Sequence, residues 1–215
     1  MIISDHPLCV SLDYIGSAVF AATGAVAAIR KQMDLLGCVV LAIVTAIGGG
    51  TLRDMLIGQP GVFWIHQPRY IWISALTGCM AFACGHFISW KRNVLLVPDA
   101  VGLALFTWIG CEKTCLLGLS NTTIVIMGVL TGAARGIIRD ILSDEVPSVL
   151  IKGELYATAS MMGGLIFLAA TRFGLSDAWR AQLCICATLA LRMAAIRWKI
   201  ALPTSRVIFS GRINL

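Results

Sequence analysis

Two apolar stretches of this chain carry charged residues where charges are rarely found. The first reads LLGCVVLAIVTAIGGGTLRDMLIG and contains Arg53 and Asp54, and the second reads TTIVIMGVLTGAARGIIRDILS and contains Arg135, Arg139 and Asp140. Ionisable side chains within a membrane are costly and commonly mark an ion or substrate path. Interfacial snorkelling is the alternative interpretation, more for Arg53 than for the deeper Arg135. The charges predict a polar pathway with these residues as its charged or gating groups.

Glycines interrupt both charged stretches. Gly48, Gly49 and Gly50 are consecutive in the first, and Gly132 and Gly136 lie in the second. Glycine costs about 1 kcal/mol per position relative to alanine inside a helix, so we expect the helices to bend or unwind there. Backbone groups freed at membrane depth need contacts with protein or with water. Close packing through small residues explains one or two glycines of the triplet, but three adjacent residues do not share one face. A broken helix is therefore the favoured interpretation.

Two threonines lie close to the glycines. Thr45 and Thr131 come before the glycine triplet and Gly132, respectively, in the two stretches. Their hydroxyl groups can line a pore, or they can donate hydrogen bonds back to their own helix, which is the commoner behaviour. Both interpretations stay open.

The elements that position these residues are apolar helices. The 215 residues are 58% hydrophobic and 13% charged, whereas soluble chains average about 25% charged. Each of seven apolar segments is long enough to cross a hydrocarbon core of about 30 Å. They span approximately 13–30, 35–57, 69–90, 94–115, 121–142, 154–173 and 179–198. The composition excludes a disordered chain, and the continuous apolar runs disfavour a β-barrel. The scattered basic residues do not form a nucleic-acid-binding stripe.

The sequence contains an internal repeat with an offset of 86 residues. Asp13, Gly16, Ala18, Phe20 and Gly24 align without gaps on Asp99, Gly102, Ala104, Phe106 and Gly110. A unit of three spans is odd, so its second copy enters the membrane in the opposite direction. We therefore expect an all-α membrane protein with an inverted three-plus-three repeat. Residues 1–92 form the first repeat, 93–175 the second, and 176–215 an additional seventh helix with a tail.

The Arg-Asp dipeptide is part of this repeat. Arg53 and Asp54 align on Arg139 and Asp140. The duplication motivates the hypothesis that Arg53 pairs with Asp140 and Arg139 with Asp54 across a pseudo-two-fold axis.

Basic residues near the span ends indicate the orientation of the chain. Arg30, Lys31, Lys91, Arg92 and Lys152 follow alternate spans on one predicted face. Cytoplasmic loops carry an excess of Lys and Arg. We expect an integral protein of a bacterial or archaeal plasma membrane, with its N-terminus outside and its C-terminus in the cytoplasm.

Enzyme chemistry has no support in the motifs. The chain lacks HExxH, P-loop and GxGxxG signatures, and its Cys pairs at 111–115 and 184–186 lack a second ligand pair at zinc spacing. We expect no enzyme activity, no metal and no cofactor, and the cysteines are interpreted as small apolar packing residues.

The motifs AIGGGTLRDML and LTGAARGIIRDIL resemble the prokaryotic branch of the trimeric intracellular cation (TRIC) channel family over about residues 10–200. The resemblance implies a homotrimer in which each protomer has its own pore, lined by the two glycine-containing helices and passing monovalent cations, especially potassium. It places the kinks at Gly48–Gly50 and at Gly132–Gly136, and a basic constriction residue at Arg135 or Arg139. A bound lipid phosphate is associated with animal members. The same domain is also described as a bacterial glycine transporter.

The residues and the resemblance are compatible with three functions: a channel, a transporter and a structural protein. In a potassium channel, carbonyl and Thr hydroxyl groups replace part of the hydration shell of the ion. In a transporter of a small solute such as glycine, an Arg and helix N-termini suit the carboxylate, while Asp54 or Asp140 suits the amino group. A purely structural membrane protein is the third and least favoured, because the glycines weaken its helices.

Overall fold

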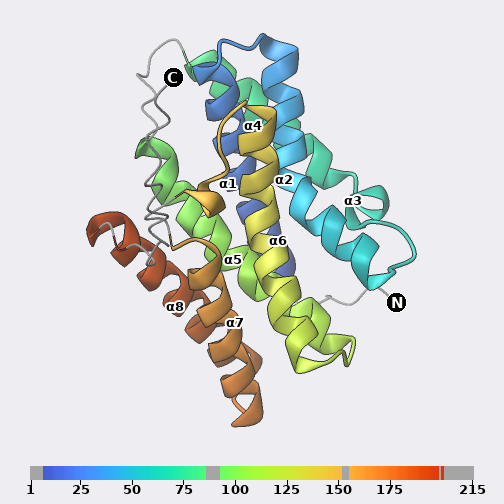
Figure 1. The fold of residues 1–215 in the computed structure, drawn as a ribbon. Coiled ribbons are helices and arrows are strands. Elements are labelled where there is room, and N and C mark those ends of the chain that lie inside the picture. Colours follow the sequence, from blue (N-terminus) through green and yellow to red (C-terminus); the bar gives the residue numbers. More distant parts are fainter. Residues whose placement is uncertain (1–6, 86–92, 152–154, 199, 201–215) are drawn as a thin grey trace, which may run out of the picture.

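The computed structural model describes residues 7–85, 93–151, 155–198 and 200, and the regular structure in these residues is helical. The long helices are α1 Pro7–Arg30, α2 Leu35–Ile57, α4 Arg69–Cys84, α5 Asn93–Leu116, α6 Asn121–Leu142, α7 Ala157–Arg172 and α8 Asp177–Trp198. Two short helices, α3 Phe63–His66 and η1 Ser148–Leu150, follow α2 and α6. Figure 1 shows the long helices packed as a bundle.

The helical segments predicted from the sequence are all present as helices. The third segment was predicted to extend to residue 90, but α4 ends at Cys84, and residues 86–90 lie outside the described part. The two short helices were not predicted. Among the described residues, α1, α2, α5 and α8 contain stretches long and apolar enough to cross a membrane. The chain is therefore an all-α integral membrane protein.

Local sequence signals explain where α2 and α6 begin and end. The Asp34 side chain accepts a hydrogen bond from the backbone N–H of Gly37 at 2.7 Å and caps the start of α2. Gly58 ends α2 with a left-handed φ of 73°, a conformation that glycine adopts without steric cost. Ser120 caps α6 by accepting from the N–H of Thr123 at 3.2 Å.

Helix α2 continues through the glycine triplet, so of the two predicted outcomes, bending or unwinding, the unwinding does not occur. Figure 1 shows instead that the ribbon of α2 changes direction along its length. Each glycine has its own close neighbour. A Cβ atom would meet the Ile138 side chain at Gly48, the backbone oxygen of Thr131 at Gly49, and the Phe63 ring at Gly50. Packing therefore accounts for all three glycines, because Gly48 and Gly49 lie against α6 and Gly50 lies against α3.

Helix α6 is also continuous, and its glycines serve the same purpose. A Cβ at Gly132 would lie 3.0 Å from Thr107 Oγ1, and one at Gly136 would lie 2.7 Å from the Tyr156 hydroxyl. These glycines let α5 and the start of α7 approach α6 closely.

Helices α1 and α5 form the centre of the bundle. Helix α1 contacts α2, α4 and α5, and α5 contacts α6, α7 and α8, while α2 and α6 pack against each other in opposite directions. Where α1 meets α5, the contacts are reciprocal. A Cβ at Gly16 would lie 2.7 Å from Phe106 Cε2, and one at Gly102 would lie 2.6 Å from Phe20 Cε2. The aligned residues of the two repeats thus contact one another.

Ion pairs identify which segments share an end of the bundle. Arg30 Nη2 lies 3.2 Å from Glu145 Oε1, so the end of α1 and the segment after α6 are neighbours. Lys113 Nζ lies 3.4 Å from Asp13 Oδ2 and 5.7 Å from the centre of the Phe63 ring. The start of α1, the end of α5 and α3 therefore meet at the other end. These are called below the Arg30 end and the Lys113 end.

Candidate functional site

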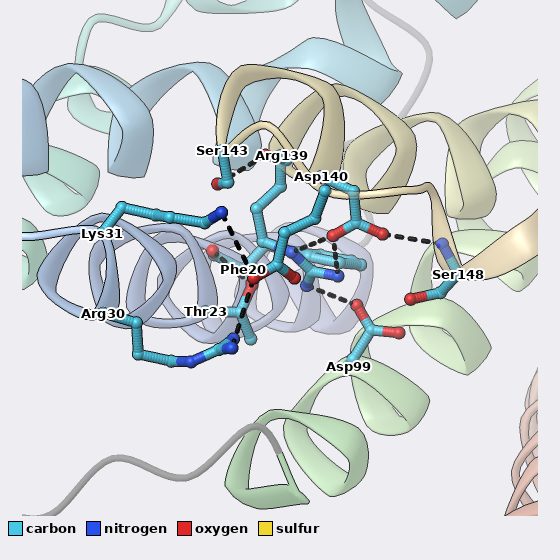
Figure 2. A network of polar contacts seen from close by, with 10 residues as sticks. Phe20, Thr23, Arg30, Lys31, Asp99, Arg139, Asp140, Ser143 and Ser148 are labelled. Atoms are coloured by element: carbon cyan, nitrogen blue, oxygen red, sulfur yellow. Dashed lines mark hydrogen bonds and ion pairs between the residues drawn. The ribbon is translucent and has the colours of Figure 1, made fainter. Parts of the chain in front are cut away.

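The Arg139 triad consists of Arg139, Asp140 and Asp99, all at most 5% exposed. Arg139 Nη1 donates to Asp99 Oδ1 at 2.6 Å, and its Nε and Nη2 donate to Asp140 Oδ1 at 2.9 and 2.8 Å. Figure 2 shows the guanidinium between a carboxylate from α5 and one from α6. Asp140 Oδ2 also accepts from the N–H of Ser148 at 2.8 Å, which positions η1. Charge-assisted hydrogen bonds of this kind offset the desolvation of buried ions.

The Arg53 pair repeats half of this arrangement. Arg53 Nε and Nη2 donate to Asp54 Oδ1 at 2.8 and 2.6 Å, and Asp54 Oδ2 accepts from the N–H of Phe63 at 3.0 Å. In both repeats, then, the aspartate binds its neighbouring arginine with one oxygen and positions the following short helix with the other. The difference is in the third partner: Asp99 binds Arg139, whereas the aligned Asp13 pairs with Lys113.

The hypothesis that the arginines pair across the repeats is wrong. Each arginine binds the aspartate that follows it, and the two groups lie at opposite ends of the bundle. The reason is geometric. Arg135 contacts Gly49 where α2 and α6 cross, and Arg53 and Arg139 each lie four residues further along helices that run in opposite directions. They are therefore separated by about 12 Å along the bundle, at 1.5 Å per residue.

Arg135 occupies the middle of the bundle. Its side chain is 1% exposed, and its Cζ lies 3.4 Å from the centre of the Phe106 ring and 5.5 Å from that of Phe20. Within the described part of the chain, its Nε and Nη1 atoms have no hydrogen-bond partner. Arg135 is deeper than an interfacial anchor, so the snorkelling interpretation does not describe it.

Thr45 and Thr131 are fully buried beside glycines of α1 and α5. A Cβ at Gly24 would lie 2.6 Å from Thr45 Oγ1, and one at Gly110 would lie 2.7 Å from Thr131 Oγ1. Thr131 donates to the carbonyl of Met127 at 2.6 Å, so it bonds back to its own helix. Thr45 Oγ1 has no hydrogen-bond partner among the described residues. The Thr45 hydroxyl group thus faces α1 and the Thr131 hydroxyl group faces α5, and lining of a pore by them stays a prediction.

A pocket lies beside the Arg139 triad at the Arg30 end. Its lining is Ala27, Arg30, Leu95, Leu96, Asp99, Arg139, Asp140, Glu145 and Ser148. Charged groups of both signs thus extend inward from the end of the bundle toward the triad.

Several polar residues lie deeper than their sequence positions indicated. Tyr70 and Tyr156 lie at the starts of α4 and α7, where membrane proteins commonly carry interfacial aromatic residues, yet they are 3% and 2% exposed. Arg192 in α8 is also buried, and its Cζ lies 4.7 Å from the centre of the Tyr156 ring. The sequence indicates Asp99 only as the repeat counterpart of Asp13, although it binds Arg139. The duplicated Asp13 and Asp99 were the signal available for finding it.

Buried and partly buried charges form an interrupted column from one end of the bundle to the other. Asp13, Lys113 and the Arg53 pair lie at one end, Arg135 in the middle, and the Arg139 triad at the other. No cluster of three or more His, Cys, Asp or Glu side chains suited to a metal occurs in the part that the structure describes. Apolar helices around a charged interior define an integral membrane protein whose interior is adapted to polar contacts.

Comparisons with known proteins show which membrane proteins this chain is similar to. A family model described as "Glycine transporter" matches residues 10–86 and again residues 96–172, so its two matches are offset by 96 − 10 = 86 residues. This offset is the one predicted from the sequence. The chain is 42% identical over 203 residues to a UPF0126 membrane protein of Vibrio cholerae, covering 93% of this chain and 84% of that protein. It is 38% identical over 206 residues to the UPF0126 inner membrane protein YadS of Escherichia coli K12, covering 94% and 98%.

A solved structure shares the fold. The TRIC trimeric intracellular cation channel orthologue from Rhodobacter sphaeroides superposes with a TM-score of 0.86 at 35% identity, covering 90% of this chain and 99% of that one. The chain belongs to the TRIC family of membrane proteins.

Proposed function

We propose that this protein is a monovalent cation channel, with potassium as its main permeant ion and one passage within each protomer. The observation that carries the proposal is the match over nearly the whole chain to a cation channel of the same fold. The proposal includes no enzyme activity and no bound cofactor.

The passage follows the column of buried charges between α2 and α6. Ionisable residues inside a membrane protein commonly mark an ion pathway. In the described arrangement, Arg135 and the rings of Phe20 and Phe106 fill the middle of that column. Ions therefore pass only when Arg135 moves, so Arg135 acts as the gate, with Thr45 and Thr131 beside the opening.

The other arginines are compatible with cations because carboxylates neutralise them. Arg53 is bound by Asp54, and Arg139 is bound by both Asp99 and Asp140. The Arg139 triad thus has a formal charge of −1, from one positive and two negative groups. Cations that have passed the mixed charges of the Arg30 end meet this net negative group before they reach the gate.

The assembly is a homotrimer of protomers with seven spans, in an inverted three-plus-three repeat with one additional helix. The reciprocal contacts of Gly16 with Phe106 and of Gly102 with Phe20 support the inversion, as does the opposite direction of α2 and α6. Residues 1–92 and 93–175 are the two repeats, and 176–215 contain the seventh span. The excess of Lys and Arg near alternate loops supports an N-terminus outside the plasma membrane and a cytoplasmic C-terminus.

Potassium efflux from vesicles containing the purified protein tests the channel. The wild type is expected to release potassium faster than empty vesicles, and Arg135→Ala faster still, because the gate is removed. Arg172→Ala, at the exposed end of α7, is the control and should match the wild type. Efflux from wild-type and Arg135→Ala vesicles no faster than from empty ones would refute the proposal.

A secondary transporter of glycine is the second candidate, and the description of the matching family model favours it. The Nε and Nη1 atoms of Arg135, which lack partners among the described residues, suit a carboxylate. Uptake of labelled glycine that saturates with concentration, in vesicles without potassium conductance, would select the transporter over the channel.

A further inference from the structure

Arg135 lies on a pair of aromatic rings that belong to different repeats. Phe20 from α1 and Phe106 from α5 are fully buried, with ring centres 5.6 Å apart. Each ring contacts a glycine of the other helix, Phe20 against Gly102 and Phe106 against Gly16. The rings are therefore held in position by the contact between the two central helices.

The aliphatic stem of Arg135 lies against a glycine of α2. A Cβ at Gly49 would meet the Thr131 carbonyl oxygen and would lie 2.8 Å from Arg135 Cγ. Gly49 is also the residue that aligns with Arg135 in the repeat, because 135 − 86 = 49. Only one long side chain fits where α2 and α6 cross, and the second repeat supplies it.

The aromatic faces are the principal close partners of the guanidinium. The Phe106 ring centre is 3.4 Å from Cζ and that of Phe20 is 5.5 Å away, although the two residues are equivalent in the repeat. Two nitrogen atoms of the guanidinium have no hydrogen-bond partner among the described residues. A desolvated cation–π contact is stronger than an exposed one and depends on proximity to the ring face.

We propose that the Phe106 ring, by its contact with the guanidinium, holds Arg135 across the passage, and that the Phe20 ring contributes much less. This inference rests on the proposed channel function. Phe106 is a positioning residue: it acts through Arg135 and sets the fraction of time that the gate is closed. The two halves of the repeat are thus unequal at the gate, despite their matching sequences.

Phe106→Leu and Phe20→Leu form a matched pair for testing this inference. Both remove a fully buried ring that packs on a glycine, and they differ in distance to Arg135. Phe106→Leu should increase potassium efflux about tenfold, and Phe20→Leu less than threefold. In an Arg135→Ala background, neither change should alter efflux further, because the guanidinium that contacts the rings is absent.

Two results would overturn the inference while leaving the channel intact. One is that Phe106→Leu releases potassium at the wild-type rate while Arg135→Ala releases it faster than the wild type. The other is an equal increase from both phenylalanine variants that persists in the Arg135→Ala background, because that would indicate general loosening of the bundle.

Thermal unfolding in detergent supplies a readout that does not need transport. In double-mutant cycles, the apparent Tm should show coupling between Phe106 and Arg135, and weaker coupling between Phe20 and Arg135. Coupling between Phe106 and Arg135 without potassium flux in any variant would refute the channel but leave the proposed contact between these two residues standing. Absence of coupling between Phe106 and Arg135 would refute the proposal that Phe106 positions Arg135.

Discussion

Replacing Asp99 with Asn removes one of two carboxylate charges that bind Arg139. The Arg139 Nη1 to Asp99 Oδ1 distance is 2.6 Å, and the two side chains are 5% and 4% exposed. Removing one partner of a buried ion pair typically costs 3–5 kcal/mol. Because Asp140 still binds Arg139, we expect a cost near the lower limit, about 3 kcal/mol. For a chain of this size, that lowers the apparent Tm by about 6–12 °C.

Asp13→Asn is the matched control, because Asp13 occupies the same position in the first repeat. Its partner Lys113 is 3.4 Å away, and the side chains of Asp13 and Lys113 are 7% and 18% exposed. Because this contact is longer than the one between Arg139 and Asp99 and its lysine is partly exposed, we expect its loss to cost less, about 1 kcal/mol. The apparent Tm should fall by at most about 4 °C.

Tryptophan fluorescence of the protein in detergent measures both Tm values under identical conditions. An equal decrease for the two variants, or a larger decrease for Asp13→Asn, would refute the reasoning that burial and the close contact make the Arg139 triad the stronger site.

Adjacent glycines and a surface ion pair give two further tests. Gly49→Ala should lose about 2 kcal/mol of stability because its Cβ meets the Thr131 backbone. Gly48→Ala should be close to neutral because its Cβ meets only the movable end of Ile138, and similar Tm values for the two would contradict the packing described here. Arg30→Ala should cost less than about 1 kcal/mol, decreasing with salt, because Arg30 and Glu145 are each 21% exposed. A salt-independent loss of several degrees in Tm would show that this pair acts as a buried one.

The positions of the helices could be predicted from the sequence, because apolar runs of membrane length leave few alternatives. Segments 35–57 and 121–142 coincide with α2 and α6. The short helices α3 and η1 could not be predicted in the same way. Their positions depend on Asp54 and Asp140, which bind them from preceding helices.

The glycine triplet shows the limit of propensity arguments. Three glycines weaken an isolated helix, but in the bundle each one is matched by a different neighbour, including Ile138 and Phe63. Tertiary packing therefore overrides the local preference, and this cannot be calculated without knowing what surrounds the helix.

The charged residues were identified correctly as unusual, but their partners were not. Cross-pairing of Arg53 with Asp140 treats aligned residues as neighbours. In helices that run in opposite directions, aligned residues away from the crossing point lie at opposite ends. Residues at the crossing point do meet, which is why Arg135 contacts its own counterpart, Gly49.

Current recording across a planar bilayer tests the central claim most directly, namely that a potassium path through the protomer is closed by Arg135. Purified wild-type protein in symmetric potassium chloride should show discrete openings, and Arg135→Ala should spend a larger fraction of time open. Silent bilayers for both proteins, with saturable glycine uptake by the same preparation, would contradict the account.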